Sequence, residues 1–160
     1  MSKLLNPFFR VMRFGSSHGA PMDFIYHKTY AKDRYVLVYA LKMIENDLKR
    51  IFEFIEPSEE NLNTYSHRLY ELFLRSATEF ETNCKQILAA NGYTCSRDLN
   101  IRDYHKINQA MQLSKYEVKL SMWYPDAKVF IPLEEWERGS GLTWYQEYNL
   151  VKHQIGRAHV

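Results

Sequence analysis

Residues 34–57 read RYVLVYALKMIENDLKRIFEFIEP and carry the clearest apolar pattern in the chain. The apolar side chains recur at alternating steps of four and three residues, at Leu37, Leu41, Ile44, Leu48, Ile51 and Ile55. This repeat places one apolar stripe along a helix, so we predict a helix from Arg34 to about Glu56. Pro57 ends the helix, because the residue before a proline avoids the helical conformation.

A second apolar stripe follows a short polar turn. Its members alternate in the same way, at Leu69, Phe73, Ala77, Phe80, Cys84 and Ile87. Either Ser66 or Asn63 is suited to cap the helix, since a short side-chain oxygen accepts from the free amides of the first turn. The helix ends near Ala90, where Asn91-Gly92 is a C-terminal signal. We expect the two helices to pack antiparallel as a helical hairpin.

Shorter elements follow. A helix from Asn100 to about Leu113 has an inner face of Ile101, Tyr104, Ile107 and Met111. Alternation from Tyr116 to Met122 and a return run at Lys128–Ile131 predict a β-hairpin, which must lie on the helices to be stable. Thr143 begins a last helix. We therefore expect a mainly α protein, an antiparallel helical bundle with a small β-hairpin insertion near residues 116–131, truncated at its C-terminus.

The chain divides into three predicted parts: an irregular segment 1–33, a single helical domain 34–153, and a non-native tail 154–160. The tail carries the sequence of Ile155–Val160, IGRAHV, which resembles a translated DNA sequencing adapter. The codons ATC GGA AGA GCA CAC GTC encode it and also spell part of that adapter. Gln154 fits as well, because the adapter bases that precede them complete its codon. The alternative is a natural polar tail.

Composition narrows the class of protein. With 160 residues, 46% hydrophobic and 25% charged, the chain fits one globular domain. The net charge of +2 lacks the basic excess of a dedicated DNA-binding protein. No apolar run is long enough to span a membrane, and Cys84 and Cys95 have no metal-ligand spacing. The N-terminus has no continuous apolar core of a signal peptide, and the two cysteines suit a reduced compartment, so we expect a cytoplasmic protein. We expect no metal or cofactor, since phosphate-loop, dinucleotide, nucleophile-elbow and zinc motifs are absent.

Two polar patterns are candidates for function. In the second helix, Arg68, Glu71, Arg75 and Glu79 lie along one face with alternating sign, either as a solvated, salt-bridged face or as a polar seam at a cleft. In the last helix, Tyr145, Asn149, Lys152 and His153 share a face that could hold phosphate and move a proton near neutral pH. The alternative there is an ordinary solvated face. Asp103, His105 and Lys106 are expected to face solvent.

The segment YNLVKH, residues 148–153, resembles the Asn-x-x-Lys-His segment of HEPN-like helical proteins of bacterial defence and toxin–antitoxin systems. Residues 67–88 resemble a long HEPN helix, and the likeness extends over 34–90 and 142–153. It implies a dimerising helical bundle and, in active members, a metal-independent RNase site built from an Arg and a His a few residues apart. His153 is then the general acid and base, Lys152 a phosphate contact and Asn149 the polar neighbour.

This sequence departs from that pattern. No Arg precedes His153 at the required spacing, and the pair with four residues between them, Arg13 and His18, falls in a Gly/Ser-rich loop. Two hypotheses follow. The first is an RNA-cleaving effector, in which Arg68 and Arg75, or Lys152, neutralise the phosphate. The second is a non-catalytic helical module that binds a protein partner through its aromatic surface.

Overall fold

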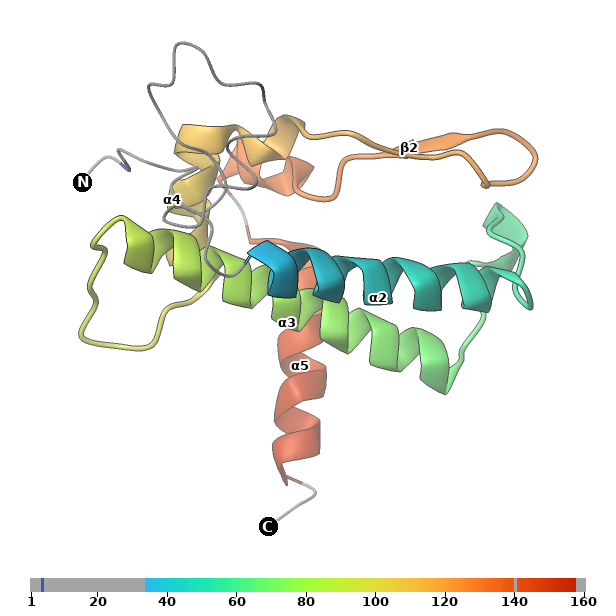
Figure 1. The fold of residues 1–160 in the computed structure, drawn as a ribbon, viewed down its shortest axis with the longest axis horizontal. Helices are drawn as coiled ribbons and strands as arrows, with labels where there is room; N and C mark the ends of the chain where they lie inside the picture. Colours follow the sequence, from blue (N-terminus) through green and yellow to red (C-terminus); the bar gives the residue numbers. More distant parts are fainter. Residues whose placement is uncertain (1–3, 5–33, 140, 158–160) are drawn as a thin grey trace.

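The computed structural model describes Leu4 and residues 34–139 and 141–157. Its long elements are the helices α2 (Arg34–Phe52), α3 (His67–Ala90), α4 (Ile101–Met111) and α5 (Thr143–Arg157), with the strands β1 (Val118–Leu120) and β2 (Lys128–Phe130) (Figure 1). The mainly helical prediction with a small antiparallel hairpin is confirmed. The predicted irregular segment 1–33 lies outside the described residues except for Leu4, and α5 extends to Arg157, into the predicted tail.

Helices α2 and α3 form the predicted helical hairpin. They lie side by side in antiparallel directions, joined by a connector with a short turn of 3-10 helix at Glu59–Asn61 (Figure 1). Ser66 caps α3, because its side chain accepts a hydrogen bond from the backbone N–H of Arg68 at 3.2 Å. An ion pair between Asp47 and Arg75 ties the two helices together. Helix α2 ends at Phe52, earlier than predicted, and the next residues form a turn.

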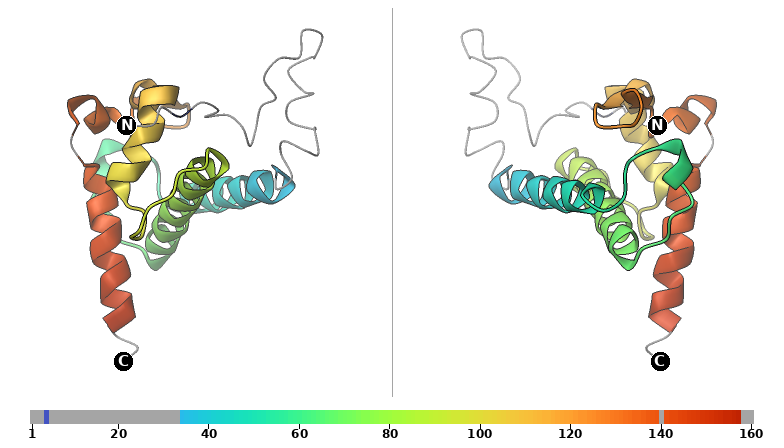
Figure 2. Two further views of the ribbon diagram at one scale, coloured as in Figure 1. Left: turned by 90° about the vertical axis from the view of Figure 1, so that its left-hand side faces the viewer. Right: turned by 90° about the vertical axis from the view of Figure 1, so that its right-hand side faces the viewer.

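The core lies on the other side of α3, where α4, α5 and the 3-10 helix Glu134–Arg138 with Trp136 meet (Figure 2). Helix α3 separates α2 from α4 and α5, and α5 crosses the α2–α3 pair instead of running beside it (Figure 1). The side chains that are almost completely buried include Leu88, Tyr104, Ile107, Trp136 and Leu142. Aromatic residues dominate this core because each ring removes a large apolar area from water.

The hairpin is covered only in part, since Leu120 and Phe130 are half-buried. Only Val118–Leu120 and Lys128–Phe130 form strands, and Val118, Met122 and Val129 are exposed. The hairpin is anchored at its turn, where the Tyr124 N–H donates to the Pro57 carbonyl at 2.8 Å and Lys128 pairs with Glu59. Alternation in a strand defines two faces, but it does not determine that another element covers one of them.

Helix α2 leaves apolar side chains uncovered within the described part of the chain. Tyr35, Val36, Tyr39 and Leu41 are all more than half exposed, although Leu41 belongs to the predicted stripe. Only one described helix, α3, packs along α2, so the stripe contacts it mainly through Ile51 and its half-buried neighbours. In the described part of the chain, no helix has the length and apolarity needed to cross a membrane.

Candidate functional site

A buried carboxylate lies where α3, α4 and α5 meet. Glu81 of α3 is 7% exposed and accepts hydrogen bonds from the Tyr104 hydroxyl at 3.2 Å and the Tyr148 hydroxyl at 3.1 Å. Lys85 reaches its Oε1 atom at 2.8 Å, and Lys152 reaches its Oε2 atom at 3.2 Å. Both carboxylate oxygens therefore have two donors each, and all three helices contribute to one polar network.

The carboxylate and the ammonium groups of this network stabilise one another in their charged forms. Burial raises the Glu81 pKa, but the hydrogen bonds from Lys85 and Lys152 outweigh it, so the pKa lies below its ordinary value. Burial likewise opposes the charge on Lys152, yet its hydrogen bond to Glu81 raises the Lys152 pKa. Two ammonium groups against one carboxylate leave the network with an excess positive charge. The side chains of Lys85 and Lys152 are 46% and 51% exposed, so solvent can reach that charge.

The structure separates the residues predicted on the polar face of α5. Tyr145 is 4% exposed and lies in the core, so its assignment to that face is wrong. Its ring meets Tyr104 edge-on with centroids 6.3 Å apart, and burial raises the pKa of Tyr145 to about 12. Lys152 is at the Glu81 network and Asn149 is half-buried. His153 follows Lys152 in α5, and its side chain lies outside the described residues.

Glu81 was not among the residues that the sequence singled out. The second half of α3 buries Ala77, Glu81, Cys84 and Leu88, at steps of four, three and four. This face is rotated slightly from the predicted one, which included Phe73 and Phe80 and so missed Glu81. The sequence did contain a signal for a buried carboxylate, because Glu81 lies four residues after Ala77 and three before Cys84, in line with both on a helix. Acidic residues are almost never buried unless they are paired, which makes such a position informative.

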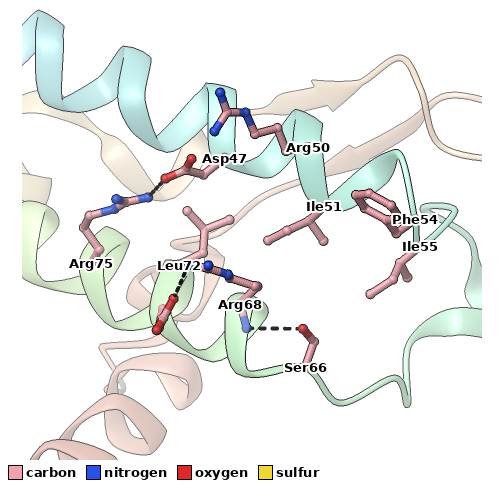
Figure 3. Close-up of a pocket in the computed structure, with 10 residues that line it drawn as sticks. Asp47, Arg50, Ile51, Phe54, Ile55, Ser66, Arg68, Leu72 and Arg75 are labelled. Carbon is pink, nitrogen blue, oxygen red and sulfur yellow. Dashed lines mark hydrogen bonds and ion pairs between the residues drawn. The ribbon is translucent and has the colours of Figure 1, made fainter.

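Arg68 and Arg75, the predicted substrate-binding residues, line a different place. A pocket of about 640 Å³ opens between α2 and α3, and Figure 3 shows both arginines on its wall with Arg50 of α2. Its lining comes from α2, α3 and the residues that flank them, and none of it comes from α5. The structure therefore brings the two arginines together with Arg50, but not with Lys152 or Asn149.

A second buried carboxylate has a structural role. Asp103 was expected to face solvent, and that prediction is wrong, since the residue is 1% exposed. Its carboxylate accepts from Arg97 at 2.8 Å, Tyr93 at 2.7 Å and Lys106 at 3.0 Å, and it closes a capping box with Asn100. Asp103 follows the capping residue Asn100 by three positions, so its carboxylate lies at the start of α4, where the free backbone amides attract a negative charge. His105 is half-buried and contacts the Trp136 carbonyl.

The two carboxylates predict how stability depends on pH. Burial raises the pKa of both carboxyls, but hydrogen bonds from donor groups outweigh it. The pKa of Glu81 therefore lies below its ordinary value of 4.5, and that of Asp103, which Arg97 lowers most, lies below its ordinary value of 3.8. A carboxyl whose pKa is lower in the folded state contributes stability fully above its unfolded pKa and loses it as the pH falls toward the folded value. We expect the melting temperature, followed by circular dichroism, to fall steadily below about pH 4.5.

The matched variant for this pH dependence is Glu81→Gln. It removes one of the two titrating groups, so its melting temperature should change less between neutral and acidic pH than that of the wild-type chain. Equal acid dependence in the two proteins would contradict the assignment of the acid response to Glu81. The exposed carboxylate of Glu147 provides the control, because Glu147→Gln should leave the wild-type acid response unchanged.

In the described part of the chain, no group of three or more His, Cys, Asp or Glu side chains is arranged to hold a metal ion. Comparison with known proteins adds no further constraint: no family model, no curated protein and no solved structure matches this chain.

Proposed function

We propose that the protein is a HEPN-like RNA-cleaving effector of a bacterial defence or stress system, with α5 as its active helix. The observation that supports this is the position of Lys152. Its ammonium is held by Glu81 beside that of Lys85, with half of each side chain exposed, and His153 is the next residue of α5. Two exposed cationic groups, one of them on the residue that precedes His153 in the sequence, fit the charge of a phosphodiester, for which ammonium groups are common ligands.

The chemistry follows from these groups. The 2′-oxygen of a ribose attacks the adjacent phosphorus while His153 accepts the proton of that hydroxyl. The bond from phosphorus to the 5′-oxygen breaks, and the imidazolium gives its proton to the leaving oxygen. The products are a 2′,3′-cyclic phosphate and a 5′-hydroxyl end. Lys152 and Lys85 stabilise the negative charge that builds up on the phosphoryl oxygens. Histidine suits this role because its ordinary pKa lies near neutrality.

The test is cleavage of a labelled single-stranded RNA by the full chain in the presence of a chelator. We expect products with cyclic phosphate ends, and a rate lowered by at least about a hundredfold in His153→Ala, the usual range for loss of an acid–base group. Lys152→Met should lower the rate about tenfold through loss of one charged contact. His67→Ala, at the exposed start of α3, is the matched control and should cleave at the wild-type rate.

An unchanged rate in His153→Ala would exclude the site assignment and point to a contaminating nuclease. Cleavage that disappears with the chelator would contradict the metal-independent mechanism. Loss of cleavage in His67→Ala as well would mean that the loss in His153→Ala reports on folding and not on chemistry.

A second candidate function is that of a non-catalytic module that binds a protein partner or a second copy. The observation in its favour is the apolar surface of α2, where Tyr35, Val36 and Tyr39 lie on one side of the helix and are exposed, and Leu41 is exposed on another side. Surfaces of this kind, rich in tyrosine, are typical of interfaces. Absence of RNA binding, together with a molecular mass in sedimentation that rises with protein concentration, would favour self-association through α2 over catalysis.

A further inference from the structure

The pocket between α2 and α3 has an apolar floor and a charged rim. Ile51 and Leu72 form its buried base, and Ile55 and Phe54 extend the apolar wall toward the connector (Figure 3). Phe54 lines the pocket and is 86% exposed, which is unusual for a phenylalanine. The volume of about 640 Å³ lies within the range of pockets that hold small organic ligands.

The rim has one excess positive charge. Arg50, Arg68 and Arg75 line the pocket together with the carboxylates of Asp47 and Glu71. Arg75 is committed to Asp47, and this contact also lowers the Asp47 pKa. Arg68 pairs with Glu71 at 3.1 Å, but both side chains are largely exposed, so that pair is weak and exchangeable. Arg50 of α2 and Arg68 of α3 are therefore the guanidinium groups suited to receive an anion.

We propose that this pocket binds a small amphiphilic carboxylate, that is, a single carboxylate carried on an apolar chain or ring. The carboxylate binds at the rim, where Arg68 on the α3 side and Arg50 on the α2 side carry planar donors that match carboxylate oxygens (Figure 3). The apolar body rests on Ile51, Leu72 and Phe54. This site is separate from the residues that the proposed RNA cleavage uses, because α5 contributes nothing to the lining.

Charge complementarity favours this ligand over a nucleic acid strand. One carboxylate balances the one excess charge of the rim, whereas a strand brings a charge with every nucleotide. The additional phosphates would meet the carboxylates of Asp47 and Glu71 at the same wall. The apolar lining residues also require an apolar partner, which a phosphate backbone does not supply. A bound carboxylate would connect α2 to α3 and stabilise the helical hairpin.

The test is calorimetric titration of the full chain with decanoate, kept below its micelle concentration. Decanol and decyltrimethylammonium have the same apolar chain with no charge and with the opposite charge. We expect saturable binding of decanoate, with decanol and the cation each weaker by about tenfold or more. Decanoate should also raise the melting temperature in proportion to the logarithm of its concentration. Equal binding of decanol would overturn the proposal, because the arginines would then contribute nothing.

Variants locate the site. Arg68→Met and Arg50→Met keep the apolar stem and remove the donors, so each should weaken decanoate binding by about tenfold. Arg102→Met removes an exposed arginine of α4 and should bind as the wild-type chain does. Circular dichroism of each variant confirms that it is folded. Decanoate affinity that stays the same in both Arg50→Met and Arg68→Met would overturn the assignment.

A competition experiment separates this ligand from RNA. Decanoate should remain bound when a single-stranded oligoribonucleotide is added, and it should not slow RNA cleavage. The proposal would be overturned if the oligoribonucleotide displaces decanoate from the wild-type chain but not from Arg68→Met. The pocket would then be part of the RNA-binding surface. Failure of RNA cleavage leaves this result unaffected, since the decanoate titration uses no RNA.

Discussion

Replacement of Asp103 by alanine is expected to lower the free energy of unfolding by about 3–5 kcal/mol, the usual cost of removing one partner of a buried ion pair. The carboxylate is 1% exposed and receives hydrogen bonds from Arg97, Tyr93 and Lys106 and from the backbone N–H of Asn100. The substitution leaves these donors without their acceptor and also removes the capping box of α4. If the wild-type chain has an unfolding free energy of about 5 kcal/mol, near the lower end of the range for native proteins, this substitution would remove most of it.

Urea denaturation followed by tryptophan fluorescence measures this effect, because Trp136 lies in the core against α4, where His105 contacts it. The matched control is Asp98→Ala, which removes an exposed carboxylate five residues earlier and should change the unfolding free energy by less than about 0.5 kcal/mol. If Asp103→Ala unfolds at the same urea concentration as Asp98→Ala, the network around α4 contributes nothing to stability. A chain already unfolded without urea would agree with the prediction.

The second large effect is expected for Glu81→Ala, at about 2–4 kcal/mol. The lower limit is smaller than for Asp103 because Lys85 and Lys152 are half-exposed and can turn into water. The hydroxyls of Tyr104 and Tyr148 lose an acceptor in the core, although each retains a second contact, to the Leu99 carbonyl and to Thr78. The loss of stability therefore comes mainly from the cavity and from the two buried hydroxyls.

Glu81→Ala also distinguishes a structural from a positioning role of Glu81. Urea denaturation gives the stability, and Glu147→Ala, an exposed carboxylate on α5, is the matched control that should have little effect. If Glu81 positions Lys152 for RNA cleavage, the folded fraction of Glu81→Ala should cleave RNA about tenfold more slowly than the wild-type chain. A wild-type rate per folded molecule would restrict Glu81 to a structural role. A stability equal to that of Glu147→Ala would contradict the prediction.

Helix α3 connects the two proposed sites through different faces. Arg68 and Arg75 face the pocket shared with α2, whereas Glu81 contacts Lys152 of α5 and lies about two turns beyond Arg75. A ligand bound in the pocket and an RNA bound at α5 would therefore contact the same rigid element without sharing a side chain.

The elements with strong local signals could be predicted from the sequence. The apolar repeat of residues 37–55 and the end signals Asn91-Gly92 define the helical hairpin, because periodicity and backbone preferences act within a few residues. The same holds for the caps: Ser66 and Asn100 both accept from the first turn of their helices, as their short polar side chains predict. Cys84, a member of the predicted apolar stripe, is buried in the core.

The candidate sites were predicted only in part, because their members come from separate helices. Arg68 and Arg75 share one face of α3 and therefore line one pocket, as helical spacing implies. That Arg50 and the apolar floor belong to the same pocket depends on where α2 packs. The spacing of residues along α3 carries no information about the position of α2. Lys152 reaches Glu81 across 71 positions of sequence, so no local pattern could pair them.

By itself, the sequence determined where the helices lie, the caps of α3 and α4 and the mainly α class, since these follow from short-range periodicity and capping chemistry. Only the tertiary structure decided which polar residues are buried. Asp103 and Tyr145 carry polar groups and looked solvent-facing, yet both are in the interior, because neighbouring elements supply their partners and cover their sides. Burial depends on the sum of contacts from all elements, and a polar side chain is stable inside when distant parts of the chain bring donors to it.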